Sequence, residues 1–172
     1  MRFMRLEKST GSWDRFTQQW RSECSDYDED FAHYATASLS ALEYECDTGS
    51  PDDGSGVFGL LDENDRFHAA CFLNSTFLKG WTGKVLRVRH LVLSPYYDFE
   101  DLELEHYATT LAHAFTAIVN VSNDELPSQH IKIHYRSPYD RTFFAAFALT
   151  MKSSNGLQSV ESKGMWLHLT KA

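Results

Sequence analysis

Two histidines are the candidates for proton transfer that the predicted strands of this sequence bring together. His90 and His134 lie on segments that are predicted as neighbouring strands. An imidazole there could act as the general base that deprotonates an amine, although a buried, hydrogen-bonded structural histidine is the more common role. We therefore take His90 as a candidate base.

Motifs for metal, phosphate and nucleophile sites are missing. His106 and His113 are seven residues apart on one predicted helix, whereas two metal ligands from one helix prefer a spacing of three or four. There is no Walker loop, no G-x-S-x-G motif and no EF-hand spacing. Cys24, Cys46 and Cys71 are odd in number and widely spaced, which predicts free thiols in a reducing compartment. We expect no metal site.

Negative charge is concentrated in the first half of the chain. The formal net charge is −8, and the stretch from Ser22 to Asp65 holds thirteen acidic residues and no Lys or Arg. Such a surface repels nucleic-acid phosphates and anionic lipid and steers a basic partner. We therefore expect a basic protein surface as partner, with no direct nucleic-acid contact and no membrane contact. The alternative is that these carboxylates only keep the surface soluble.

Strand and helix signals alternate along a single predicted domain, residues 1–172. The chain has no run approaching the ~18 apolar residues of a membrane span, and its start lacks the apolar core of a secretory signal, so a cytoplasmic location is expected. Strands are predicted at 1–8, 57–61, 67–78, 84–93 and 131–136 and in the tail after 160, with a hairpin partner at 157–160. Helices are predicted from Trp13, after Asp28–Asp30, at 102–121 and at 141–152.

This order predicts an α/β protein (α+β mixed sheet) with a central mixed sheet of six or seven strands and about four flanking helices. The strands at 85–94 and 131–136 should be parallel neighbours, because a helix connects them. Alternation places Leu86, Val88, His90 and Val92 on one face of the first of these strands and Arg87, Arg89, Leu91 and Leu93 on the other. The predicted core includes Leu39, Leu91, Leu111, Phe115, Ile133 and Phe147.

The order of elements, together with the segments LVLSPYYDFEDLELEHYATTLAHAF and IKIHYRSPYDRTFFAAFAL, resembles the GNAT N-acetyltransferase superfamily over essentially the whole chain. The resemblance implies that a long strand ends in a loop and helix that hold the pyrophosphate of acetyl-CoA. The residues at that position are Leu93, Tyr97, Asp98, Glu100, Asp101 and Glu103.

This sequence departs from the family pattern in that loop and at the general acid. The family's loop glycines let backbone N–H groups approach the pyrophosphate, but no glycine lies between Gly83 and Gly156. Two like charges ~4 Å apart at an effective dielectric of 20 repel by roughly 4 kcal/mol. We expect Asp98, Glu100 and Asp101 to cap the first N–H groups of the following helix themselves. The family's tyrosine acid is matched by Phe143 or Phe144, which have no proton to give. The resemblance then leaves Tyr139, four or five residues earlier, as the candidate acid, which could substitute only with a rearranged turn. Phe143, Phe147 and Met151 are expected to form the buried stripe of an ordinary helix.

Two hypotheses follow for function. The first is a GNAT-fold binding or structural module without acetyl-CoA chemistry or cofactor, whose acidic face docks a basic partner. Small proteins of this kind resemble products of phages and mobile elements, which would place the chain in the cytoplasm or in a virion. The alternative is an acyl-CoA-dependent N-acyltransferase that uses acetyl-CoA and acts on a cationic amine or a protein lysine. The acidic loop favours the first hypothesis, and the sequence leaves open whether the protein is an enzyme.

Overall fold

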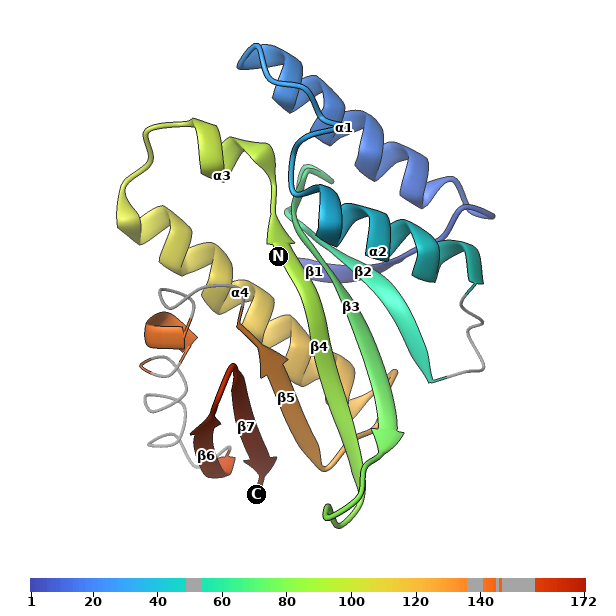
Figure 1. The fold of residues 1–172 in the computed structure, drawn as a ribbon, viewed down its shortest axis with the longest axis vertical. Coiled ribbons are helices and arrows are strands. Elements are labelled where there is room, and N and C mark those ends of the chain that lie inside the picture. The colour runs from blue at the N-terminus through green and yellow to red at the C-terminus, as the bar shows by residue number, and fades with distance from the viewer. Residues whose placement is uncertain (49–53, 136–140, 145, 147–156) are drawn as a thin grey trace.

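A seven-stranded mixed sheet organises the structure, a computed structural model that describes residues 1–48, 54–135, 141–144, 146 and 157–172 (Figure 1). The strand order is β1-β2-β3-β4-β5-β7-β6. The strands are β1 Arg2–Leu6, β2 Ser55–Leu61, β3 Phe67–Phe77, β4 Lys84–Leu93, β5 His130–His134, β6 Leu157–Lys163 and β7 Trp166–Lys171. The helices are α1 Ser12–Asp26, α2 Thr36–Thr48, α3 Pro95–Phe99 and α4 Leu104–Asn123.

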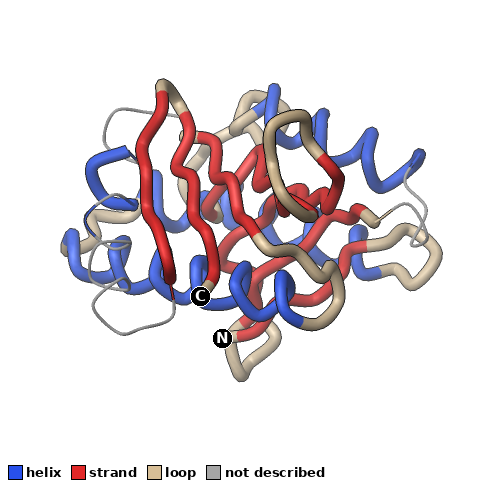
Figure 2. The backbone as a smooth tube through the Cα atoms, turned by 90° about the horizontal axis from the view of Figure 1, so that it is seen from below, coloured by secondary structure: helices blue, strands red, loops and turns tan. Residues whose placement is uncertain are grey.

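One pair of neighbouring strands is parallel and the others are antiparallel. Strands β4 and β5 run in the same direction because α4 carries the chain back between them. This pair, the mixed sheet, the number of strands and the C-terminal hairpin β6–β7 confirm the sequence predictions. Seen from below, the strands form a twisted layer with helices on both sides (Figure 2).

Each face of the sheet has its own core. On one face, α1 and α2 cover β1 to β4 and bury an aromatic cluster that includes Trp13, Phe16 and Trp20, which recur at helical spacing. On the other face, α4 buries its apolar stripe against the middle of the sheet. The predicted core residues Leu39, Leu91, Leu111, Phe115 and Ile133 are all buried, which confirms those predictions, and Phe147 lies outside the described residues.

The boundaries of three predicted helices differ from those observed. The second helix is predicted directly after Asp28–Asp30 but begins at Thr36. Asp28 has a φ of 56° and Ala35 a φ of 44°, and this left-handed backbone cannot be part of an α-helix. α4 begins at Leu104, and the short helix α3 precedes it. Of the helix predicted at 141–152, residues 141–144 and 146 are helical, and the rest lies outside the described residues.

A β-bulge at His90 overturns the predicted faces of β4. The β3–β4 register passes from Phe72↔Arg89 to Ala70↔Val92, so that Cys71 faces two residues of β4, and His90 takes a φ of 53°. A bulge inserts one residue and reverses the alternation that follows it. As a result, Leu91 and Leu93 join Leu86 and Val88 in the core beneath α4, while Val92 packs with α1 and α2.

Cys24, Cys46 and Cys71 are free thiols, as predicted. The part of the chain that the structure describes contains no helix long and apolar enough to cross a membrane. It also contains no group of three or more His, Cys, Asp or Glu residues that could hold a metal ion.

Candidate active site

The parallel strands β4 and β5 separate beyond the middle of the sheet. Their pairing runs from Val85↔His130 to Val88↔Ile133 and ends there, whereas β4 continues along β3 as far as Leu93 (Figure 1). The backbone groups of residues 89–93 that face β5 therefore lie outside the parallel ladder. We call this region the β4–β5 opening. An extended ligand with amide groups can bond to a strand edge of this kind.

Two histidines lie at the β4–β5 opening. His134 follows Ile133, the last paired residue of β5, and is exposed, with its ring centroid 4.7 Å from that of Trp166. His90 is the bulged residue of β4 and is half-buried. The structure thus brings the candidate base His90 and the neighbouring His134 to the same end of the ladder, and two imidazoles near one opening can accept a proton.

The structure does not describe the candidate general acid. Tyr139 lies outside the described residues, so its role stays a prediction. Phe144 is 2% exposed and belongs to the core beneath α4, and the half-buried Phe143 packs against that core. Phe143, predicted on the buried stripe of this helix, is thus only half-buried, and the buried ring is that of Phe144. The other predicted members of the stripe, Phe147 and Met151, lie outside the described residues. Neither Phe143 nor Phe144 can supply a proton.

The segment between β4 and α4 is exposed and acidic. Leu93 is buried at the end of β4, while the side chains of Asp98, Glu100, Asp101 and Glu103 lie at or near the surface. The prediction that carboxylates from this segment cap α4 is wrong. The N-cap is Glu103, without a side-chain hydrogen bond, and the Glu100 carboxylate instead accepts a 2.6 Å hydrogen bond from the hydroxyl of Tyr27 on α1.

The start of α4 does not fit a diphosphate. The uncapped N–H groups of its first turn would suit an anion, but four carboxylates, at 98, 100, 101 and 103, precede it, and Glu105 lies in its first turn. The segment also lacks the glycines that would let its backbone approach phosphate oxygens. A donor bound in the β4–β5 opening would gain little from a diphosphate at this helix.

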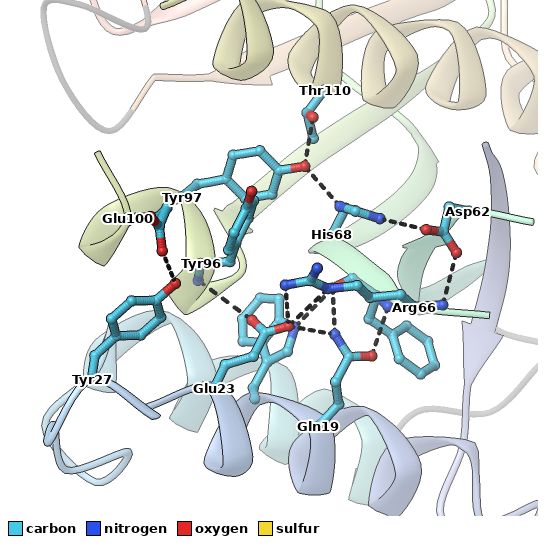
Figure 3. A network of polar contacts seen from close by, with 12 residues as sticks. Gln19, Glu23, Tyr27, Asp62, Arg66, His68, Tyr96, Tyr97, Glu100 and Thr110 are labelled. Carbon is cyan, nitrogen blue, oxygen red and sulfur yellow. Dashed lines mark hydrogen bonds and ion pairs between the residues drawn. The ribbon is translucent and has the colours of Figure 1, made fainter. Parts of the chain in front are cut away.

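A hydrogen-bonded relay through the buried His68 fixes the side chain of Tyr97 (Figure 3). Its hydroxyl lies 2.7 Å from Nδ1 of His68 and accepts a 2.8 Å hydrogen bond from Thr110 on α4. Nε2 of His68 in turn lies 3.1 Å from a carboxylate oxygen of Asp62. Burial raises the pKa of Asp62, but the hydrogen bonds from His68 and from two backbone N–H groups outweigh it, so the net pKa is lowered. Burial raises the pKa of Tyr97.

A second buried group holds the start of α3. The Glu23 side chain on α1 accepts hydrogen bonds from Arg66 at 3.0 and 3.1 Å, from Gln19 at 2.9 Å and from the backbone N–H of Tyr96 at 3.4 Å (Figure 3). The Arg66 guanidinium also stacks 4.5 Å from the centroid of the Tyr96 ring. We call Gln19, Glu23, Arg66 and Tyr96 the Glu23 clamp. Together with the relay it fixes the chain that leaves β4.

Neither the Glu23 clamp nor the relay was predicted from the sequence. Glu23 lies on the buried stripe of α1, seven residues after Phe16 and three after Trp20. A carboxylate at a core position usually has a partner, and this was the available signal. A separate cavity of about 370 Å³ lies between α1 and α2, beside Trp13 and Leu39, and its walls come from the helical layer and its connecting segments.

Among the comparisons with known proteins, the one with solved structures supports the fold. No family model matches the sequence, and no curated protein matches it. A solved structure described as a probable acetyltransferase matches with a TM-score of 0.53 at 14% identity, covering 95% of each chain. The chain has the GNAT fold. At that identity the likeness establishes the fold and not the activity.

Two further GNAT-like structures match less well. One is a point mutant of the spermidine N-acetyltransferase SpeG from Vibrio cholerae, with a TM-score of 0.48, 11% identity and coverage of 99% of this chain and 95% of that one. The other is a GNAT-family acetyltransferase from Staphylococcus aureus Mu50, with a TM-score of 0.44, 8% identity and coverage of 98% of this chain and 97% of that one.

Proposed function

We propose that this GNAT-fold protein is an N-acyltransferase that binds an acyl thioester in the β4–β5 opening and transfers the acyl group to an amine. The observation that carries the proposal is that pairing ends at Val88↔Ile133 while β4 continues to Leu93. A purely structural module would gain from extending this ladder, because each further backbone hydrogen bond contributes ~0.5–1.5 kcal/mol.

The protein groups at the β4–β5 opening suit this chemistry. Backbone N–H groups of residues 89–93 that face β5 can bond to a ligand carbonyl and stabilise negative charge on its oxygen. His90 or His134 would take the proton from the attacking amine. The amine nitrogen would bond to the carbonyl carbon of the thioester as its C–S bond breaks, and the released thiolate would take up the proton that the imidazole removed from the amine.

The donor in this proposal is recognised by its amide-containing arm and not by its diphosphate. The carboxylates before α4 oppose a nucleotide diphosphate at the helix start, as argued above. S-acetylpantetheine, which carries the arm without phosphate, should therefore bind at least as tightly as acetyl-CoA. In a protein that binds the donor's diphosphate at a helix N-terminus, acetyl-CoA would bind more tightly than S-acetylpantetheine.

Calorimetric titration of the purified chain with both donors tests the proposal. We expect S-acetylpantetheine to bind and acetyl-CoA to bind no more tightly at physiological salt. The triple variant Asp98→Arg, Asp101→Gly, Glu103→Gly should raise affinity for acetyl-CoA and leave affinity for S-acetylpantetheine unchanged. Failure of both donors to bind to either protein would contradict the proposal.

A second candidate function, a non-catalytic module that docks a basic protein surface, is favoured by the carboxylates of residues 98–105 and by the stretch from Ser22 to Asp65 without Lys or Arg. It needs no donor. If neither donor binds and a polylysine peptide does, with affinity that falls steeply as salt rises, this candidate replaces the first.

A further inference from the structure

A group of positive charges lies on the part of the sheet face that the described helices leave uncovered. Helices α1 and α2 cover β1 to β4 on that face, and their buried cluster includes no described residue of β5, β6 or β7. In Figure 1, β4 and β5 pass in front of α4, and no described helix is drawn over the near side of β5 and β7. The residues on this uncovered face are set by the strand register.

Three cations are neighbours there. Arg87 of β4 pairs directly with Lys132 of β5, on strands about 4.8 Å apart, and Arg89 lies two residues further along the same face of β4, before the bulge at His90. All three side chains are half-buried. We call Arg87, Arg89 and Lys132 the cationic triad.

Within the part of the chain that the structure describes, the cationic triad has no acidic partner. The ion pairs found there involve other basic side chains, and the β3 residues beside Arg87 and Arg89 are Asn74 and Phe72. The acidic residue that the register places on this face, Glu161 of β6, is bound at 2.6 Å to Lys163. In a protein with a net charge of −8, three adjacent cations thus have no acidic partner among the described residues.

Burial and mutual repulsion act on these groups. Burial first, and then the charge of Arg89, lower the pKa of Arg87, and burial with the charges of both arginines lowers the pKa of Lys132. Like charges held this close destabilise the free protein. An arrangement of this kind makes sense where an anion arrives to neutralise it.

Aromatic rings and a histidine border the cationic triad. The ammonium of Lys132 lies 4.6 Å from the centroid of the Trp166 ring, and His168 pairs with Lys132 across the β5–β7 ladder. Nδ1 of His168 is buried and has no hydrogen-bond partner among the described residues. The ring centroid of Trp81 lies 5.2 Å from that of the same imidazole, with the two rings tilted by 56°. Guanidinium and ammonium donors beside flat apolar rings suit a compact ligand that carries an oxyanion.

We propose that the cationic triad binds the carboxylate or phosphate of a small acceptor molecule and thereby holds the acceptor's amine beside the β4–β5 opening. Arg89 directly follows Val88, where the parallel ladder ends, so an anion on the triad lies next to the proposed transfer site. That the anion belongs to an acceptor rests on the proposed function, whereas the anion site does not. This acceptor is anionic, in contrast to the cationic amine that the overall charge suggested.

A small ligand is favoured over a polyanion. The stretch from Ser22 to Asp65, without Lys or Arg, includes the end of α1, all of α2 and the segments around them, and α2 lies beside this half of the sheet. A long phosphate chain that extended beyond the triad would meet those carboxylates. A single oxyanion on a small molecule would not.

Thermal shift measurements with inorganic phosphate and with succinate test the anion site, against sodium chloride of equal ionic strength. We expect both anions to raise Tm by several degrees when they are well above their dissociation constants. The shift should be lost in Arg89→Gln and in Lys132→Gln. It should persist in Arg2→Gln and Lys79→Gln, which remove charges elsewhere on the surface. Without ligand, the two triad variants should be at least as stable as the native chain.

Several outcomes would overturn the proposal. One is an anion shift equal to that of chloride, and another is a shift that all four variants retain. Tighter binding of single-stranded DNA than of a mononucleotide through Arg89 would assign the triad to nucleic acid. Loss of acetyl-CoA binding but not of S-acetylpantetheine binding in Arg89→Gln would assign it to donor phosphates. An anion shift that persists when neither donor binds would retain the anion site and reject only the proposed function.

Discussion

The Glu23 clamp gives a quantitative test of how the chain before α4 is held. The Glu23 side chain is 10% exposed and accepts four hydrogen bonds, two of them from Arg66, whose own side chain is 39% exposed. Glu23→Gln keeps the shape and one acceptor oxygen but removes the charge.

Hydrogen bonds to a charged group contribute ~1.5–3 kcal/mol each, and breaking a fully buried ion pair costs ~3–5 kcal/mol. Arg66 is partly in water, so screening reduces the effect. We expect Glu23→Gln to lower the free energy of unfolding by about 2–3 kcal/mol, or Tm by roughly 5–10 °C.

The matched control is Glu43→Gln. Glu43 forms a 3.3 Å ion pair with Lys8, and these side chains are 55% and 40% exposed. An exposed pair contributes ~0–1 kcal/mol, so this change should be nearly neutral. Urea denaturation at about 25 °C and neutral pH measures both variants. If Glu23→Gln lowers the free energy of unfolding no more than Glu43→Gln does, the Glu23 clamp does not stabilise the structure, and our explanation of how the chain between β4 and α4 is held is refuted.

Three further predictions follow from burial and charge. Leu111→Ala should cost roughly 2–5 kcal/mol in urea denaturation, because Leu111 is 2% exposed, whereas Leu104→Ala, at a residue 81% exposed, should change stability little; equal costs would mean that the phase of α4 is wrong. Burial raises the pKa of Cys24 to about 11 and that of Cys46 to about 12, so iodoacetamide at mildly alkaline pH should modify both at least ~100-fold more slowly than a free thiol, and rapid labelling would contradict this. Burial and nearby lysines lower the pKa of His168 below 6.5; in an NMR titration phosphate should raise it, since a bound anion favours the protonated ring, and an unchanged value would place the anion elsewhere.

Patterns local in the sequence predicted most of the fold. Apolar residues at helical spacing located α1 and α4, and the helix between two apolar strands required β4 and β5 to be parallel. The core positions Leu111 and Phe115 followed from periodicity alone.

Features that depend on tertiary geometry were not predictable in the same way. The bulge at His90 depends on how β3 and β4 pair, and no turn residue in the sequence marks it. A prediction that continues strict alternation past His90 therefore places Leu91 and Val92 on the wrong faces of the sheet. Likewise, the sequence predicts that Glu100 caps α4, but its carboxylate pairs with Tyr27, 73 residues away.

The positions of the charges also could not be predicted from the sequence composition. The acidic stretch suggested a basic partner or a cationic acceptor, because composition reports the sum of charges and not their positions. Only the strand register showed that Arg87 and Lys132 are neighbours on an uncovered face. The position of a small number of cations then changes the inferred acceptor from cationic to anionic.

The most direct test of the proposed function is NMR mapping of amide shifts while S-acetylpantetheine is titrated into ¹⁵N-labelled protein. We predict that the largest shifts fall on residues 89–93 of β4 and on His134, the residues that border the β4–β5 opening. The exposed acidic side of α1 and α2 should change little and serves as an internal control. Absence of shifts at the opening with saturating donor, or shifts confined to α1 and α2, would contradict the account.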